Sequence, residues 1–417
     1  MQDQTPMRLQ DGRETAETRN EWKSPISNRQ GLGYPHGVRG RECAAECNSA
    51  IRQIENLRYN YELCRLGLRC AWMALALVGG LFSPELVQGQ EAVADVQKLR
   101  IELAPKGWLL FSQKTEVGDY DLFLARPDGS GKRNLTQSAA VHEFGGRFSP
   151  DNKRMLYRRL PKDPAAKPGE VINHDSWGAA GSLVIANADG SNSQELGKSG
   201  EWPWASWSPD GKQLACLYKR EGEIRILDLE TKQVVKEMPR QGIFQQLFWS
   251  GDGKKLCGTA NLNGQDWNIL CVDIASGKAT QVSRSLCCTP DWFAGDAERV
   301  IYSCRVPGVG SDYGWTMLMQ GTSDGKSRSL LYGERGRHIY YGCTSPDDKY
   351  AVFAVPESDG GIDSEMVVMR LADAPIIVPA DYAQLNELYP GSKTGPVVHL
   401  GQAGFEPHWT YAEIGGK

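Results

Sequence analysis

Residues 321–325 (GTSDG) have the GxSxG spacing in which many hydrolases carry a nucleophilic serine. Such a serine needs a strand before it and a helix after it, so that a sharp turn exposes its hydroxyl group. Here an Asp-Gly turn is followed by the strand-like stretch 326–331, so we interpret the segment as a hairpin turn. Residues 129–132 (GSGK) also lie on a turn and lack the full spacing of a phosphate-binding loop.

Histidine side chains are the second group that could do chemistry. His142, His338 and His408, supported by Gln245 or Gln246, could hold a divalent cation through their imidazole nitrogens. A funnel lined by His, Glu, Trp and Tyr would also suit a peptide or a sugar. The candidate binding residues are His142, Glu143, Glu201, Trp202, Gln245, Gln246, His338, Tyr340, Tyr341, Glu406 and His408.

A repeated phrase would position these side chains. Residues 207–214 have the sequence WSPDGKQL, and degraded copies begin at Phe148, Trp249, Phe293 and Thr344. In such a phrase proline presets φ, Asp bonds to nearby backbone amides, and Gly or Asn tolerates positive φ. Because a short apolar run follows each copy, the phrase predicts a strand, a tight turn and a second strand.

A second family of turns lies between the copies, at 127–129, 188–190, 275–277 and 323–325. Each repeat then holds about four short strands, as expected for one propeller blade. Residues 107–137 lack an initial strand, and the tail supplies a single one at 405–411. Joining these two ends completes a blade, removes exposed sheet edges and predicts an all-β, six-bladed β-propeller closed by a C-terminal strand.

The register of the repeats suggests where the candidate residues lie. His142, Glu201 and His338 each lie six residues before the first residue of their phrase. Equivalent positions of a closed ring gather around one central mouth. We therefore expect these three side chains to face the same opening.

The phrase, with its Asp-Leu-apolar strand and Asp-Gly turn, resembles the TolB-type (PD40, WD40-like) propeller repeat of Gram-negative envelope proteins. The resemblance covers residues 105–414 and implies the propeller fold. The same repeat occurs in translocation-system proteins, peptidases and polysaccharide lyases, so it is far less specific for function. TolB itself carries an α/β domain before its propeller, and we find no such pattern in this sequence.

The N-terminal part has a different character. Residues 1–65 are polar and lack periodicity, which predicts disorder or a wrongly assigned start. Arg65 and Arg69 precede the apolar run 71–82, and a small-residue site follows at 87–89. This pattern at 66–89 predicts a cleaved signal peptide, with a membrane anchor as the alternative and no membrane span after cleavage. Residues 90–104 are interpreted as a linker.

The overall charge and the cysteines set limits on partners. The formal net charge of −4 gives no reason to expect nucleic acid or an anionic membrane surface as a partner. Seven cysteines follow the predicted cleavage site, mostly inside apolar runs, and are interpreted as buried core residues. The adjacent pair Cys287 and Cys288 stands out, but adjacent cysteines rarely bond to each other.

Two function classes follow. The favoured one is a monomeric, non-enzymatic propeller, exported to the periplasm or the cell exterior, that needs no cofactor and binds a protein or peptide at its central mouth. The alternative is a polysaccharide lyase, since oligogalacturonate lyases resemble this repeat and use histidines to hold a divalent cation. In that case His142, His338 and His408 would be the metal ligands.

Overall fold

The computed structural model describes residues 84–162, 181–219, 222–262, 267–283, 286–306, 315–334, 336–356, 364–376, 378 and 395–415. The predicted disordered segment 1–65 and most of the predicted signal segment lie outside these residues. Among the described residues, no helix is both long and apolar enough to cross a membrane.

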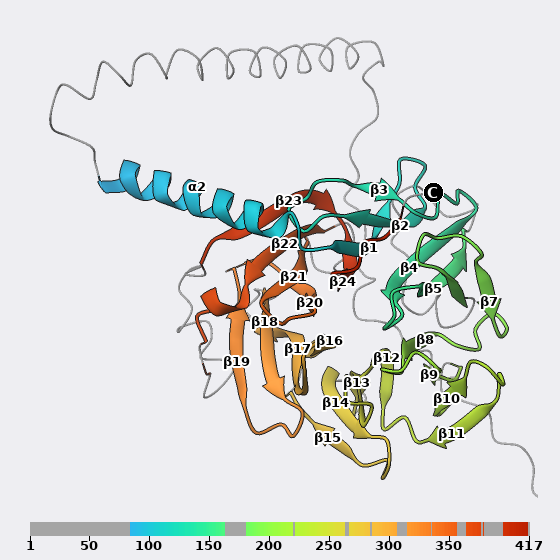
Figure 1. Ribbon diagram of the computed structural model, residues 1–417. Coiled ribbons are helices and arrows are strands. Elements are labelled where there is room, and N and C mark those ends of the chain that lie inside the picture. The colour runs from blue at the N-terminus through green and yellow to red at the C-terminus, as the bar shows by residue number, and fades with distance from the viewer. Residues whose placement is uncertain are drawn as a thin grey trace, which may run out of the picture. The chain divides into compact units, whose positions relative to one another are not determined.

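Six four-stranded antiparallel sheets surround a central channel, as the repeats predict (Figure 1). Blade 1 contains β24 (Phe405–Thr410), β1 (Trp108–Lys114), β2 (Tyr120–Ala125) and β3 (Arg133–Asn134). Blade 2 contains β4 (Val141–Phe148), β5 (Arg154–Pro161), β6 (Ser182–Asn187) and β7 (Gln194–Leu196). Blade 3 contains β8 (Trp204–Trp207), β9 (Gln213–Leu217), β10 (Ile224–Asp228) and β11 (Val234–Met238).

The other three blades follow the same order from the channel outward. Blade 4 contains β12 (Ile243–Trp249), β13 (Lys255–Asn261), β14 (Trp267–Asp273) and β15 (Ala279–Gln281). Blade 5 contains β16 (Cys287–Phe293), β17 (Asp296–Val306), β18 (Trp315–Thr322) and β19 (Arg328–Tyr332). Blade 6 contains β20 (Tyr340–Thr344), β21 (Tyr350–Val355), β22 (Glu365–Arg370) and β23 (Val397–Ala403), with the short 3₁₀ helix η1 (Leu371–Asp373) after β22.

The ring closes where the sequence predicted. The C-terminal strand β24 pairs antiparallel with β1, with Trp409 opposite Leu109. The two ends of the repeat region therefore share blade 1, and their pairing closes the ring.

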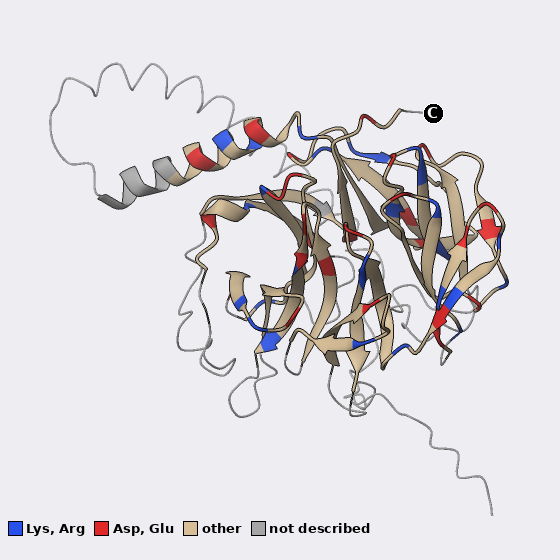
Figure 2. Cartoon of the chain, turned by 60° about the horizontal axis from the view of Figure 1, so that its bottom comes forward, with Lys and Arg blue, Asp and Glu red and all other residues tan. Residues whose placement is uncertain are grey.

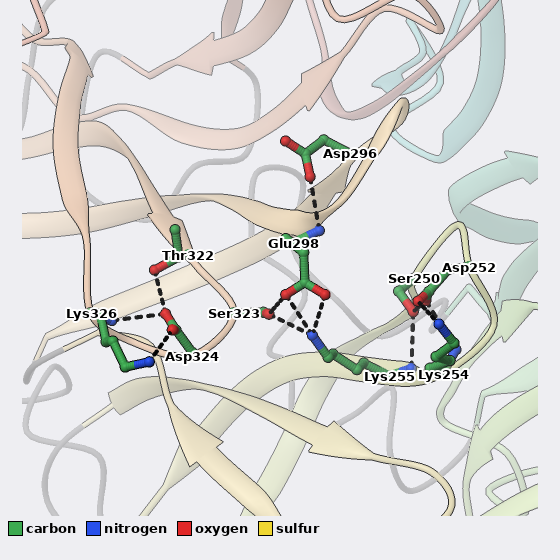
Figure 3. Close-up of polar contacts among 10 residues, drawn as sticks. All are labelled: Ser250, Asp252, Lys254, Lys255, Asp296, Glu298, Thr322, Ser323, Asp324 and Lys326. Carbon is green, nitrogen blue, oxygen red and sulfur yellow. Dashed lines mark hydrogen bonds and ion pairs between the residues drawn. The ribbon is translucent and has the colours of Figure 1, made fainter.

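The repeated phrase forms the tight turn between the first and second strands of a blade. Ser208 donates to Asp210 (Oγ to Oδ1, 2.6 Å), and Asp210 in turn accepts from the Lys212 amide at 3.1 Å. Gly211 has φ of +67°, a region that few other residues enter easily. The turn of blade 4 repeats this pattern with Ser250 and Asp252 (Figure 3). The side chains of the phrase thus satisfy the turn's own backbone groups.

Tryptophans at the first position of the repeated phrase, called the phrase-leading position, join neighbouring blades. The Trp207 indole donates to the Arg147 carbonyl of blade 2 at 3.2 Å. The Trp292 indole donates to the Phe248 carbonyl of blade 4 at 3.0 Å. Trp292, not Phe293, therefore occupies the phrase-leading position of blade 5, and the predicted register was wrong there by one residue. The extra residue is taken up in the turn, where the pairing register shifts after Trp292.

Residues 90–104 were predicted to be a linker, but all of them except the last belong to a helix. Helix α2 spans Pro84–Leu103, and Leu99 and Leu103 are fully buried in the core shared with blades 6 and 1. Glu102 accepts hydrogen bonds from Arg370 and Tyr350 of blade 6. Apolar and polar contacts from one face of the last helical turns thus hold α2 against the propeller.

Charged residues are spread over the sheets and α2, with both signs interspersed (Figure 2). This distribution agrees with the small net charge of −4. Over the part of the chain that the structure describes, it offers no large field of one sign of the kind that attracts a polyanion.

Candidate functional site

The innermost strands β24, β4, β8, β12, β16 and β20 line the central channel (Figure 1). Five of them carry a residue with positive φ three positions before the phrase-leading residue. These residues are Gly145 (φ 63°), Gln246 (53°), Thr289 (50°), Tyr341 (57°) and Glu406 (51°). Pairing registers shift at the same places, so each position is a β-bulge. Bulges bend a strand and redirect side chains, which here re-aims them at the channel.

The exception is β8, the short inner strand of blade 3. It has four residues, whereas β4 of the neighbouring blade has eight. Pro203 precedes β8 and has no N–H with which to extend the pairing. The wall of the channel is therefore incomplete between blades 2 and 3.

A second layer of channel residues directly precedes the phrase-leading residue of each blade. In this layer an ion pair crosses the channel. Arg147 of blade 2 donates to Asp291 of the opposite blade 5 (Nη1 to Oδ2, 2.7 Å). The Arg147 guanidinium also lies 4.4 Å from the ring centre of Phe248 in blade 4. Burial opposes the charge on Arg147, but Asp291 together with Cys343 and Glu406 outweighs this effect, so the pKa of Arg147 is raised. This pair closes the centre of the channel.

His408 lies in the same layer and acts as a structural acceptor. Its Nδ1 accepts the Phe148 backbone N–H at 3.1 Å. Burial, with a smaller effect of the Arg147 charge, lowers the pKa of His408 to about 3. The imidazole is therefore neutral at physiological pH, and one nitrogen is already used.

A second buried ion pair lies nearer the mouth. Arg158 of β5 donates to both carboxylate oxygens of Glu406, at 2.7 and 2.5 Å. The Arg158 guanidinium is 3.6 Å from the ring centre of Trp204 in blade 3. A Cβ at Gly145 would lie 2.7 Å from Arg158 Nη2, so glycine is needed there for space as well as for its φ of +63°.

These groups line a crevice between blades 2 and 3, defined by Arg147, Arg158, Trp204, Ala205, Phe248 and Glu406. It is narrow, with a cavity volume of about 20 Å³, and it opens to solvent. A smaller hollow of about 10 Å³ also contacts Arg158 and includes Trp202 and Ser182. The crevice combines aromatic faces, two guanidinium groups and a carboxylate, a set that can contact the backbone and side chains of a peptide.

The structure brings some predicted residues into this region. Glu406 lines the crevice, and Gln246 and Tyr341 share its bulge position around the channel. Gln246 accepts from the Thr259 hydroxyl at 2.5 Å and from the Thr289 amide at 3.2 Å. Gln245 is 2% exposed. Burial raises the pKa of Tyr341, so its phenol stays protonated.

Other predicted residues are placed elsewhere. Trp202 is 5% exposed and packs in the core between blades 2 and 3, beside Tyr218. The Glu201 carboxylate accepts the Lys198 amide at 2.8 Å in a local turn. Glu143 is buried and accepts from Arg159 at 2.9 Å. Packing between the sheets thus uses Trp202, whereas a local turn uses Glu201 and an ion pair within blade 2 uses Glu143.

His142 and His338 each have a partner within the fold. His142 Nδ1 accepts the Tyr120 N–H at 3.2 Å, and burial lowers the pKa of His142. His338 Nδ1 is 3.0 Å from the Thr316 hydroxyl, and its ring stacks on Tyr340. Within the described ranges, no group of three or more His, Cys, Asp or Glu side chains is arranged to hold a metal ion.

Ser323 of the GxSxG segment lies in a hairpin turn between β18 and β19, as predicted (Figure 3). Its hydroxyl donates to Glu298 at 2.7 Å and accepts from Lys255 at 2.8 Å. Lys255 also pairs with Glu298 and so links blade 4 to blade 5. This network stabilises the contact between two blades.

Arg147, Arg158, Trp204 and Phe248 were not among the residues predicted from the sequence. One signal was available, because Arg147, Phe248 and Asp291 all directly precede a phrase-leading residue once Trp292 is placed in register. Arg158 lies on the second strand of its blade. The repeated phrase does not show which residues of that strand lie near the channel.

No model of a known protein family matches the sequence, and no curated protein matches it. Among solved structures, TolB from Acinetobacter baumannii is 17% identical with a TM-score of 0.50, over 79% of this chain and 74% of that one. A putative TolB from Agrobacterium tumefaciens is 18% identical with a TM-score of 0.45, over 65% of this chain and 87% of that one. An oligogalacturonate lyase from Vibrio parahaemolyticus is 14% identical with a TM-score of 0.38, over 64% of this chain and 71% of that one. At these identities the likeness concerns the fold alone, and the fold is the six-bladed β-propeller.

Proposed function

We propose that this chain is an exported, non-enzymatic propeller that binds a peptide segment of another protein in the crevice between blades 2 and 3. The observation that carries the proposal is the interrupted channel wall beside β8, where Trp204, Phe248 and the Arg158–Glu406 pair line an opening. Guanidinium and aromatic groups of this kind dominate the binding energy of many protein interfaces.

The chemistry of the crevice favours a peptide. Its charged groups already form internal pairs, Arg147 with Asp291 and Arg158 with Glu406. A ligand therefore gains little from charge alone, and the aromatic faces of Trp204 and Phe248 provide apolar contact area. A short segment that lays an apolar side chain against those rings at the opening of the crevice suits this arrangement.

The proposal of export is based on the signal-like segment 66–89. Cleavage of this segment is compatible with the contacts that hold α2 against the propeller. The predicted cleavage site at 87–89 falls near the start of α2. Leu99, Glu102 and Leu103, which anchor the helix, all follow that site. Cleavage would shorten α2 and keep its contacts with the propeller.

A substitution that blocks the crevice tests the binding proposal. Peptides would first be selected from a displayed library on the purified full chain, and their affinities measured by fluorescence polarisation. Replacing Ala205 with Tyr fills the crevice and should weaken binding at least tenfold. Val235→Tyr, on the exposed outer strand of the same blade, is the matched control and should leave the affinity unchanged.

Equal affinities for Ala205→Tyr and the unaltered chain, with both folded by circular dichroism, would overturn the crevice as the binding site. Export is tested separately by fractionating Gram-negative cells that express the full chain. Recovery of the chain in the cytoplasm at its full length would contradict export.

A further inference from the structure

Cys287 and Cys304 lie directly opposite each other on the neighbouring strands β16 and β17 of blade 5. Both are fully buried, and their Sγ atoms are 2.7 Å apart. The vicinal residue Cys288 faces Ser303 and belongs to a different hydrophobic cluster. The two adjacent cysteines therefore point to opposite faces of the sheet, and only Cys287 faces Cys304.

The backbone at this pair is suitable for a disulfide bond. The Arg305 amide donates to the Leu286 carbonyl at 2.8 Å, so these two residues form a hydrogen-bonded pair. Such pairs alternate with non-hydrogen-bonded pairs along an antiparallel ladder, which makes Cys287 and Cys304 a non-hydrogen-bonded pair. Opposite Cα atoms of that kind are about 4.5 Å apart, within the range that disulfides span.

We propose that Cys287 and Cys304 form a disulfide bond within blade 5 when the chain folds in an oxidising compartment. The pairing follows from the fold alone, whereas its formation in the cell rests on the proposed export. The bond would fasten the inner strand of blade 5, which carries Asp291, to the second strand of the same blade.

The oxidant is a disulfide, either of a protein oxidoreductase or of oxidised glutathione. One cysteine thiolate attacks it and releases a thiolate, and the second cysteine then attacks the mixed disulfide and releases the other. Each cysteine loses its proton, and the two electrons leave with the oxidant as two thiols. Because both sulfurs are buried in the folded chain, the exchange takes place during folding.

Cys257 and Cys271 offer an internal comparison. They too lie opposite each other, on β13 and β14, in the same hydrophobic cluster as Cys287 and Cys304. What sets the blade 5 pair apart is the contact of its two sulfurs, which lie 2.7 Å from each other. The proposal assigns the bond to the pair in blade 5.

The test uses the full chain, refolded with oxidised and reduced glutathione, alkylated, and digested with trypsin without reduction. Mass spectrometry should find peptide 285–299 linked to peptide 300–305. The link should survive Cys288→Ser and disappear in Cys287→Ser and Cys304→Ser. Absence of this link in the refolded, unaltered chain, or a link through Cys288, would overturn the pairing.

The same digest of chain isolated from Gram-negative cells, with thiols blocked at lysis, tests export separately. A linked peptide there supports both the pairing and the compartment. A chain that is linked after refolding but carries free thiols in the cell contradicts export and leaves the pairing supported.

Discussion

At the scale of single residues, the channel depends on charges that are buried in pairs. Arg147 and Asp291 join opposite blades, and their side chains are only 15% and 13% exposed. Such a pair adds little net stability when complete, but removing one partner leaves the other charge buried and uncompensated.

Arg147→Met is therefore expected to lower the free energy of unfolding by about 3–5 kcal/mol. The double variant Arg147→Met/Asp291→Leu should lose less, because no buried charge is left alone. Urea denaturation followed by tryptophan fluorescence measures both. Lys326→Met, which removes an exposed ion pair with Asp324, is the control and should leave the urea midpoint unchanged. A double variant less stable than Arg147→Met would contradict this account.

His408 should make stability depend on pH in the acid range. Its pKa is about 3 in the folded chain and about 6.5 when unfolded, so the unfolded state binds more protons between these values. The stability that this residue contributes is full above about pH 6.5 and falls as the pH drops, by up to about 1.4 kcal/mol per pH unit. Comparing urea midpoints from pH 7 to 4 for the unaltered chain and His408→Asn checks this.

Asn can still accept the Phe148 N–H but does not titrate, so His408→Asn should flatten the acid side of the profile. Identical pH profiles for the two proteins would contradict the assignment of the acid sensitivity to His408.

The candidate residues show what one sequence can predict at this scale. Glu406, Gln246 and Tyr341 were candidates because they lie shortly before a phrase-leading residue. Trp202 does so too, but the sequence does not reveal that it packs between two sheets. Arg158 was missed because its contact with Glu406 depends on the short strand β8 and on the space beside Gly145.

At the scale of elements, the strands were predictable and the helix was not. The phrase, the Asp-Gly turns and the apolar runs each repeat, so one assignment supports the others. The segment 90–104 occurs once and is rich in charge. Its spacing of Val96, Leu99 and Leu103 was nevertheless the helical signal, because these residues share the buried face of α2.

Leu99→Ala is expected to lower the free energy of unfolding by about 2–5 kcal/mol, because the side chain is fully buried against blades 6 and 1. Ile101→Ala, on the same helix and 67% exposed, is the matched control and should change stability little. Chemical denaturation of both variants measures the difference. If the two substitutions cost the same, α2 would not be docked through the Leu99 face.

At the scale of the whole molecule, the closed ring explains why equivalent residues meet. The tail strand β24 was predicted from two incomplete ends that complement each other, and its pairing with β1 places Glu406 beside Arg158 of the neighbouring blade 2. The ring brings together side chains that are 248 positions apart, such as Arg158 and Glu406. The crevice itself could not be predicted in this way, because it lies beside β8, which is shorter than β4 and pairs regularly with β9 where the other inner strands are bulged.

The central claim, that a peptide binds in the crevice between blades 2 and 3, is tested most directly by photo-crosslinking. A benzophenone-bearing phenylalanine would replace Phe248, which lines the crevice, or Trp267, which is 41% exposed on an outer strand of the same blade. With a selected peptide bound, mass spectrometry should find crosslinks from position 248 and none from position 267. Crosslinks from position 267 alone would place the peptide on the outer face of the propeller and contradict the account.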